Sequence, residues 1–430
     1  MALLVWLLLF AGMFVMGYPI AFGIAVSSMA YILLAGVDPA VIVDKMVVKF
    51  ENEFALLAVP LFILAARIMN DGKVTEKIYS FADSLVGSLK GGLAHVNIVG
   101  SIIFSGMTGS AVADASGLGL MEIEAMTEGG YDRAFSCAVT AASATIGPII
   151  PPSIPMVLYS MLSGASIGYL FIGGIIPGLL LGVAMMIYVW YIAHKRNYPA
   201  GEPFSLRKIV RSFIGAFFPL LSPVILLWGI YGGAFTPTEA AAVAAVYALI
   251  LAVFGYRMMG PKKLYAALKD VALATGTISF IVAAAFLFSY VVAREQLPNL
   301  ITDLIVNSGA VSSQWVLLLV LNIVFLILGL FLDTTVVLLI VVPILLPLVE
   351  SLGIDLVHFG VVLVLNLMIG LSTPPYGVSL FIVSGLAKVP LSKVIREIWP
   401  FVAVLVVVLL ICTFVPDTVL LLPRMLGYQG

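Results

Sequence analysis

Long hydrophobic segments follow one another along the chain, and clusters of prolines interrupt two of them. Residues 147–153 (GPIIPPS) interrupt the segment 134–162, and residues 370–377 (GLSTPPYG) interrupt the segment 356–387. Proline lacks a backbone N–H and its ring clashes with the carbonyl one turn earlier, so neither segment can continue as a single helix. At membrane depth, irregular backbone is tolerated only where protein or a water-filled cavity surrounds it. The pattern therefore predicts two discontinuous helices.

The other hydrophobic segments divide into simple and complex ones. Eight are predicted to cross a bilayer once: 2–17, 19–36, 54–70, 169–193, 214–231, 238–256, 271–292 and 398–415. Two longer stretches, 93–127 and 314–350, fit a single crossing badly because polar or small residues occur in their middle. Each is predicted to be a re-entrant helical hairpin that turns on its polar residues and returns to the side it came from.

Lysine and arginine residues indicate how the spans are oriented, because they are enriched in cytoplasmic loops. If the loop 194–213 is cytoplasmic, most basic residues fall on the same side, and only Lys45, Lys49 and Arg424 fall clearly outside. Both termini then lie outside, and the two hairpins enter from opposite sides. Each hairpin precedes a discontinuous helix, so the chain is predicted to contain an inverted repeat. Matched interrupted helices of this kind indicate the binding site of a transporter.

The composition agrees with an all-α polytopic membrane protein. The chain is 62% hydrophobic and 10% charged, whereas soluble domains contain about 25% charged residues. A net charge of −1 argues against a nucleic-acid partner. No P-loop or His/Cys metal-ligand spacing is found, so an enzyme is not expected. Three amphipathic stretches are predicted to lie flat at the membrane interface or to pack on cytoplasmic protein: 74–85, 206–213 and 391–398.

Polar residues at the hairpin turns and at the breaks are candidate ligands for a cation. Na⁺ prefers several oxygen ligands, and unwound backbone offers carbonyls while Ser and Thr add hydroxyls. The first predicted cage consists of Ser105, Gly106, Thr108, Gly109, Ser110, Gly147, Ile150 and Ser153. The second consists of Gly329, Asp333, Thr334, Gly370, Thr373 and Tyr376. The alternative for each small residue is that it only permits close helix packing.

Several ionisable residues have a structural and a functional interpretation. Arg294 could bind a substrate carboxylate, or could anchor the helix at the interface or pair with Glu295. Asp333 could orient substrate hydroxyls or cap the following helix, and a cap is slightly favoured for Asp114. Glu239 is expected to complete a capping box with a threonine three residues earlier. The predicted substrate-binding residues are Ser110, Ser153, Arg294 and Asp333.

These motifs together give the chain a family resemblance that covers essentially its whole length. It resembles the large membrane subunit, DctM-like or SiaM-like, of tripartite ATP-independent periplasmic (TRAP) transporters. The segments that carry the resemblance are SGMTGSAVAD (105–114), GPIIPPS (147–153), FTPTEA (235–240), LDTT (332–335) and STPPYG (372–377). Tyr376 departs from the pattern, since the family usually has a small or apolar residue there.

The resemblance implies an elevator-type secondary transporter with Na⁺ as coupling ion and an organic anion, of the sialic acid or C4-dicarboxylate type, as substrate. It implies three kinds of partner: a small four-helix membrane subunit, a periplasmic binding protein and membrane lipid. The expected location is a bacterial inner membrane. The expected domains are scaffold helices at 1–53, transport-domain halves at 54–193 and 271–387, an amphipathic arm with scaffold helices at 194–270, and an arm with a scaffold helix at 388–430.

Two other classes of function stay open at this point. A proton-coupled organic-anion carrier would need a titrating carboxylate in the membrane, and Asp333 or Asp114 would have to serve. A non-transporting scaffold subunit would tolerate Ser→Ala changes at the hairpin turns. A carrier that uses only hydroxyls and carbonyls should depend on Na⁺.

Overall fold

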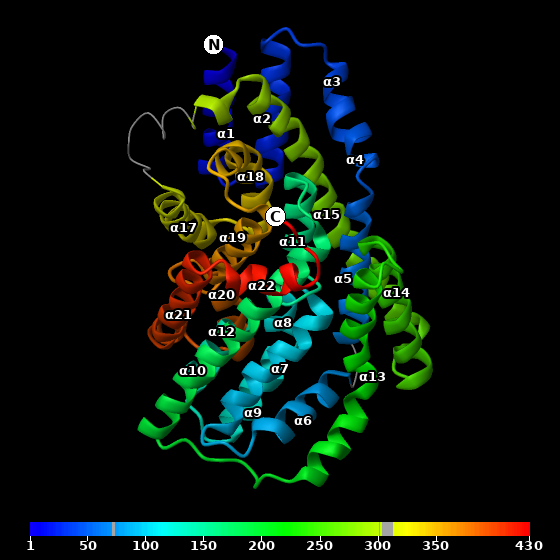
Figure 1. The fold of residues 1–430 in the computed structure, drawn as a ribbon, viewed down its shortest axis with the longest axis vertical. Helices are drawn as coiled ribbons and strands as arrows, with labels where there is room; N and C mark the ends of the chain where they lie inside the picture. Colours follow the sequence, from blue (N-terminus) through cyan, green and yellow to red (C-terminus); the bar gives the residue numbers. More distant parts are fainter. Residues whose placement is uncertain (71–73, 301, 303–312) are drawn as a thin grey trace.

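A computed structural model describes residues 1–70, 74–300, 302 and 313–430, and these form a helical bundle (Figure 1). Seven of the helices in this part of the chain are long and apolar enough to cross a membrane. The bent pair 40–51 and 54–70, with 59° between its halves, would make an eighth span. The predicted all-α, multi-span fold is therefore confirmed for the described residues.

Both expected hairpin segments form two helical arms joined by a short turn. In the first, α7 (Gly92–Thr108) ends at Gly109, whose φ of +60° suits glycine, and α8 (Ala111–Gly117) and α9 (Gly119–Glu128) follow. In the second, α17 (Gln314–Phe331) is followed by α18 (Thr334–Ser351). Both turns occur at polar residues in the middle of their segments, as the sequence predicts. That these units re-enter a membrane from opposite sides stays a prediction.

Both proline clusters break a helix, as expected from the missing N–H groups. The first break separates α10 (Arg133–Ser143) and a short 3-10 turn from α11 (Ile154–Ser163). The second separates α19 (Leu356–Leu371) from α20 (Val378–Ala387). Each break also contains a cis Pro–Pro bond.

The two halves of the repeat are interleaved. The helix after the first break, α11, packs against α18 of the second hairpin, and the helix after the second break, α20, packs against α8 and α9 of the first. A hydrogen bond of 2.7 Å from the Ser372 hydroxyl to the Ala141 carbonyl joins the two broken helices directly. Each hairpin is thus held by helices from both halves, and the breaks and hairpin turns meet in the middle of the bundle.

Longer helices surround this centre. The first two, α1 (Ala2–Val15) and α2 (Ile20–Leu34), pack on the end of α15 (Pro261–Arg294), where the Trp6 and Phe288 rings lie 4.9 Å apart. The remaining principal helices are α5 (Ala58–Asn70), α6 (Val74–Val86), α12 (Ile167–Lys195), α13 (Leu206–Tyr231), α14 (Pro237–Ile250), α21 (Leu391–Phe414) and α22 (Asp417–Met425).

Two of the three predicted interfacial helices are not separate elements. Residues 206–213 and 391–398 form the first turns of α13 and α21, each of which continues without a break into an apolar helix. The amphipathic spacing was correct, but the helices continue beyond these stretches, past Gly215 in α13 and past Pro400 in α21. Only α6 is a distinct short amphipathic helix.

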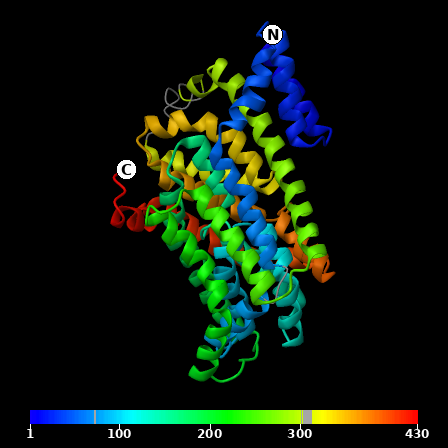
Figure 2. The same ribbon diagram turned by 90° about the vertical axis from the view of Figure 1, so that its right-hand side faces the viewer.

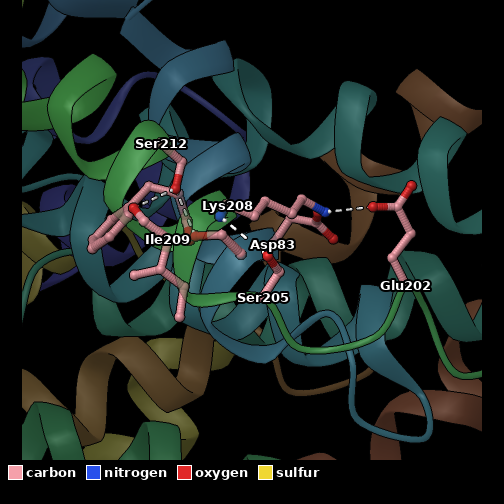
Figure 3. A network of polar contacts seen from close by, with 8 residues as sticks. Asp83, Glu202, Ser205, Lys208, Ile209 and Ser212 are labelled. Atoms are coloured by element: carbon pink, nitrogen blue, oxygen red, sulfur yellow. Dashed lines mark hydrogen bonds and ion pairs between the residues drawn. The ribbon is translucent and has the colours of Figure 1, made fainter.

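A polar contact fixes α6 against the start of α13. The Lys208 ammonium lies between the carboxylates of Asp83, at 2.7 Å, and Glu202, at 3.2 Å, as Figure 3 shows. Ser84 and Ser212 share a hydrogen bond of 2.7 Å on the same helix pair. This contact lies at the end of the molecule opposite to the N-terminus (Figures 1 and 2). The division into transport and scaffold domains stays a prediction; its 271–387 half includes residues 301 and 303–312, which lie outside the described residues.

Candidate transport site

Both hairpin turns line one cavity of about 790 Å³ near the centre of the bundle. Its wall is formed by segments from α5, α7, α8, α15 and α18, together with residues of the first break, α11 and α19. Its polar lining residues include Arg67, Asn70, Thr108, Ser110, Thr277, Asp333 and Thr335. The two predicted cages are therefore neighbours of a single central cavity, a relationship that spacing along the chain did not reveal.

The first hairpin turn lies directly against the first helix break. A Cβ placed on Gly109 would be only 2.3 Å from the Pro152 carbonyl oxygen, and one on Gly147 would be 2.6 Å from Asp114 Oδ2. Among the described residues no hydrogen bond reaches the carbonyl of Pro151 or of Pro152. Glycine is needed at these positions because backbone and carboxylate oxygens occupy the space of a side chain.

Asp114 is the charged group of this contact. It is 2% exposed; its Oδ1 accepts a hydrogen bond of 2.5 Å from the Thr108 hydroxyl, and its Oδ2 has no partner among the described residues. Sequence reasoning favoured Asp114 as a helix N-cap, and this is wrong. Ser110 caps α8 by accepting from the Ala113 amide at 3.4 Å, which places Asp114 inside the helix and turns its carboxylate toward the break.

The other residues predicted for the first cage have mixed orientations. The Ser105 hydroxyl donates to the Ile102 carbonyl at 2.6 Å, and the Ser153 hydroxyl caps α11 at 3.3 Å from the Met156 amide. The Ile150 side chain faces Gly178 of α12. Only the backbone of Ile150 can therefore contribute to a cation site, while each serine oxygen keeps a lone pair for a further contact.

The second hairpin also contacts the second break through glycine. A Cβ on Gly370 would lie 2.8 Å from the Cα of Gly329, and one on Gly329 would lie 3.3 Å from the Leu367 carbonyl oxygen. At the turn, the Thr334 hydroxyl is buried and has no hydrogen-bond partner in the described part of the chain. The second unit thus repeats the arrangement of the first, with a hydroxyl in place of the carboxylate.

The remaining residues of the second set point elsewhere. Asp333 caps α18 by accepting from the Thr335 amide at 2.8 Å, so its structural interpretation is confirmed, and its exposed side chain also lines the cavity. The Thr373 hydroxyl donates to the Ile369 carbonyl at 2.7 Å. Tyr376 is 55% exposed and its ring lies 5.2 Å from that of Phe331, so only its backbone could serve a cation.

The structure brings only part of the predicted substrate set to the cavity. Ser110 and Asp333 line it, whereas Ser153 is fully buried behind it. Arg294 is not among the lining residues; it lies at the end of α15, with its Nη1 3.5 Å from the Tyr290 hydroxyl. A role for Arg294 in binding a carboxylate therefore stays a prediction without support from this geometry.

Arg67 is a cationic side chain that lines the cavity, and sequence reasoning missed it. It lies near the end of α5 and forms an ion pair of 3.0 Å with Asp270 of α15. No local motif marks it, because it resembles an ordinary basic residue at the end of a span. Its relation to the cavity depends on how α5 packs against α15 and could not be obtained from periodicity.

The predicted capping box of Glu239 and Thr236 at the start of α14 is confirmed, with both of its hydrogen bonds present.

Interleaved hairpins and broken helices around a cavity with a few polar lining residues are typical of a membrane transport protein. The model of the tripartite ATP-independent periplasmic transporter DctM component matches residues 7–418. The chain belongs to this family and is not expected to be an enzyme.

Individual relatives are similar over most of the chain. It is 42% identical to the sialic acid TRAP transporter large permease protein SiaM of Vibrio cholerae, with 98% of each chain covered. It is 38% identical to the sialic acid TRAP transporter permease protein SiaT of Haemophilus influenzae, with 99% of this chain and 68% of the relative covered. It is 40% identical to the C4-dicarboxylate TRAP transporter large permease protein DctM of Pseudomonas aeruginosa, with 88% of each covered.

A solved structure shares the fold at low sequence identity. The crystal structure of the Alcanivorax borkumensis YdaH transporter, described as having an unusual topology, matches with a TM-score of 0.65. The match covers 86% of each chain at 12% sequence identity. This likeness shows the fold alone.

Proposed function

We propose that this chain is the large permease subunit of a Na⁺-coupled importer of an organic anion. The observation that carries the proposal is the buried Asp114 carboxylate, which lies beside the first helix break and has an oxygen without a partner among the described residues. A buried carboxylate is retained only when it is paired, protonated or bound to a cation. A nearby hydroxyl and the free carbonyls of a broken helix supply the further oxygens that Na⁺ prefers.

The second hairpin contact supports a second Na⁺ position. Its oxygens are neutral: the Thr334 hydroxyl and the backbone around Gly370 and Thr373. Two positions on either side of one cavity would couple the ions to the substrate, because each hairpin turn borders both. An ion that holds a turn against its break would complete the wall of the substrate cavity.

The cavity suits an anion of modest size. Arg67 places a guanidinium at the cavity; its Nη2 already pairs with Asp270, and a substrate carboxylate would share the guanidinium or replace Asp270 on it. Ser110, Thr277 and Thr335 offer hydroxyls at the same cavity. Relatives are named as transporters of sialic acid and of C4-dicarboxylates, and both kinds of molecule carry carboxylate groups. We therefore propose a carboxylate of one of these types as the substrate.

Transport would follow an elevator mechanism, in which the interleaved hairpin unit slides against the surrounding helices. The proposed placement is a bacterial inner membrane with both termini periplasmic and the α6–α13 contact on the cytoplasmic side. The proposed partners are a small four-helix membrane subunit and a periplasmic binding protein that delivers substrate. The family assignment supports this arrangement.

The test is uptake of sialic acid or a C4-dicarboxylate into proteoliposomes that contain the chain with its two partners. Uptake should require an inward Na⁺ gradient. In an Asp114→Asn variant, the Na⁺ concentration for half-maximal uptake should rise by at least about tenfold, which corresponds to about 1.4 kcal/mol of lost ion binding. Glu124→Gln is the matched control, because Glu124 is exposed on the neighbouring helix.

Uptake that ignores Na⁺ and follows a pH gradient would overturn the sodium proposal and favour a proton-coupled carrier. Equal Na⁺ dependence in the wild type and in Asp114→Asn would remove Asp114 from the ion site. No uptake of any organic anion under any gradient would favour a non-transporting subunit.

A further inference from the structure

A second buried carboxylate, Glu122, lies in the first hairpin unit and has no role in the site described above. It is 1% exposed, and its Oε1 has no hydrogen-bond partner among the described residues. It faces α7 at a position without a side chain, where a Cβ placed on Gly100 would lie 3.1 Å from Oε1. The glycine therefore leaves room for the carboxyl group but offers it no ligand.

The surroundings of Glu122 do not suit a metal cation. The polar groups of α7 and α10, which both pack on α9, satisfy one another: Asn97 donates to the Thr140 hydroxyl and accepts from the Ser143 hydroxyl, both at 2.7 Å. A metal ion would need several oxygen ligands, whereas a proton needs only one. Among the described residues the charged group that acts on Glu122 is Asp114, which has the same sign. Both effects favour the neutral acid.

A buried hydroxyl on the short helix α6, that of Tyr79, lies within electrostatic range of Glu122. The Tyr79 hydroxyl is buried without a partner in the described part of the chain, and burial, together with the charge that Glu122 carries when it is ionised, raises the pKa of Tyr79. Because α6 packs on α7 and on the exposed start of α13, this side provides an approach for a proton that does not pass the hairpin turn.

We propose that Glu122 is a proton-binding site of the first hairpin unit, separate from the Na⁺ position at Asp114 and loaded from the α6 side. The titratable groups that act on it are Asp114 on α8 and Tyr79 on α6. With its proton bound, the interior of the hairpin unit carries no net charge at this point. Loss of the proton leaves a buried anion that water must reach, which opens the packing of α7 against α9.

The protonation itself can be tested without transport. Infrared difference spectra of the full chain in lipid bilayers should show the C=O stretching band of a protonated carboxylic acid at neutral pH. The band should be lost in Glu122→Gln and kept in Glu124→Gln, and it should shift in heavy water in the wild type. A spectrum in which Glu122→Gln loses no such band would overturn the proposal, since Glu122 would then be ionised.

Transport distinguishes a functional proton site from a buried acid that is only structural. In the wild type, Na⁺-dependent uptake should decrease between mildly acidic and mildly alkaline pH. Glu122→Gln, which mimics the neutral form, should keep Na⁺-dependent uptake, and this uptake should no longer decrease over the same pH range. An unchanged pH profile would overturn the functional role. If the wild type itself shows no Na⁺-dependent uptake, the proposed coupling fails, while the infrared result still decides whether Glu122 holds a proton.

Discussion

The Asn366 amide donates two hydrogen bonds of 2.9 Å to Asn322, one to its side-chain oxygen and one to its backbone carbonyl. This contact ties the helix before the second break to the first arm of the second hairpin. Asn97 makes the corresponding contacts in the first unit, where it bonds Thr140 and Ser143 ahead of the first break. In both halves a buried asparagine thus fastens a hairpin arm to its broken helix.

We expect Asn366→Leu to destabilise the chain more than its change in volume alone would. It leaves the polar atoms of Asn322 partly unpaired, and an unsatisfied buried polar group costs about 1–3 kcal/mol. Thermal unfolding of the purified chain in detergent would measure this loss. The double variant Asn322→Leu with Asn366→Leu should be no less stable than Asn366→Leu alone, because both partners are then removed. Fully additive losses would contradict a specific pairing of the two amides.

Gly370→Ala should separate the second hairpin from its break. The added Cβ would lie 2.8 Å from backbone atoms of Gly329, which cannot move as the end of a flexible side chain would. We expect loss of Na⁺-dependent uptake and a stability decrease of about 1–3 kcal/mol, as is typical of overpacking. Uptake and thermal unfolding would be measured together.

Gly385→Ala is the matched control in the following helix, α20. A Cβ there meets no atom within 4 Å, and alanine is favoured over glycine inside a helix by about 1 kcal/mol. This variant should keep its uptake and be equally or more stable. If Gly370→Ala and Gly385→Ala have the same uptake and stability, the close approach of Gly329 and Gly370 is not needed for transport.

The helices and their breaks could be predicted from the sequence because local chemistry decides them. Proline clusters ended α10 and α19, and Asp333 caps α18, which is one of the two roles that the sequence left open for it. The relationships that depend on packing could not be predicted. Periodicity does not tell that α11 packs on the opposite hairpin, nor that Arg67 reaches the central cavity.

Arg67→Lys should lower the affinity for substrate more than it lowers the stability of the folded protein. Lysine keeps the charge but cannot form the planar fork that binds a carboxylate through two bonds. We expect the substrate concentration for half-maximal uptake to rise by about tenfold, corresponding to about 1.4 kcal/mol, with little change in its Na⁺ dependence. Asp270→Asn is the control, because it removes the ion pair with Arg67 and leaves the guanidinium in place. Equal effects of the two variants would assign Arg67 a structural role through that pair.

The contact between α6 and α13 should respond to salt and contribute little to overall stability. Lys208 and Asp83 are 37% and 27% exposed, and partly exposed pairs of this kind contribute about 0.2–1 kcal/mol. Lys208→Met should therefore lower the free energy of unfolding only slightly, and high salt should lower the stability of the wild type to nearly that of the variant.

The larger effect of Lys208→Met should be on the local motion of α6, because the ion pair and the neighbouring Ser84–Ser212 hydrogen bond hold this helix, which leads into the first hairpin. Hydrogen exchange of the α6 amides should become faster in Lys208→Met, while that of α11, which does not touch this contact, should stay unchanged. Unchanged exchange in α6 would show that apolar packing, including the Phe81–Phe213 ring contact at 5.7 Å, holds the helix without the ion pair.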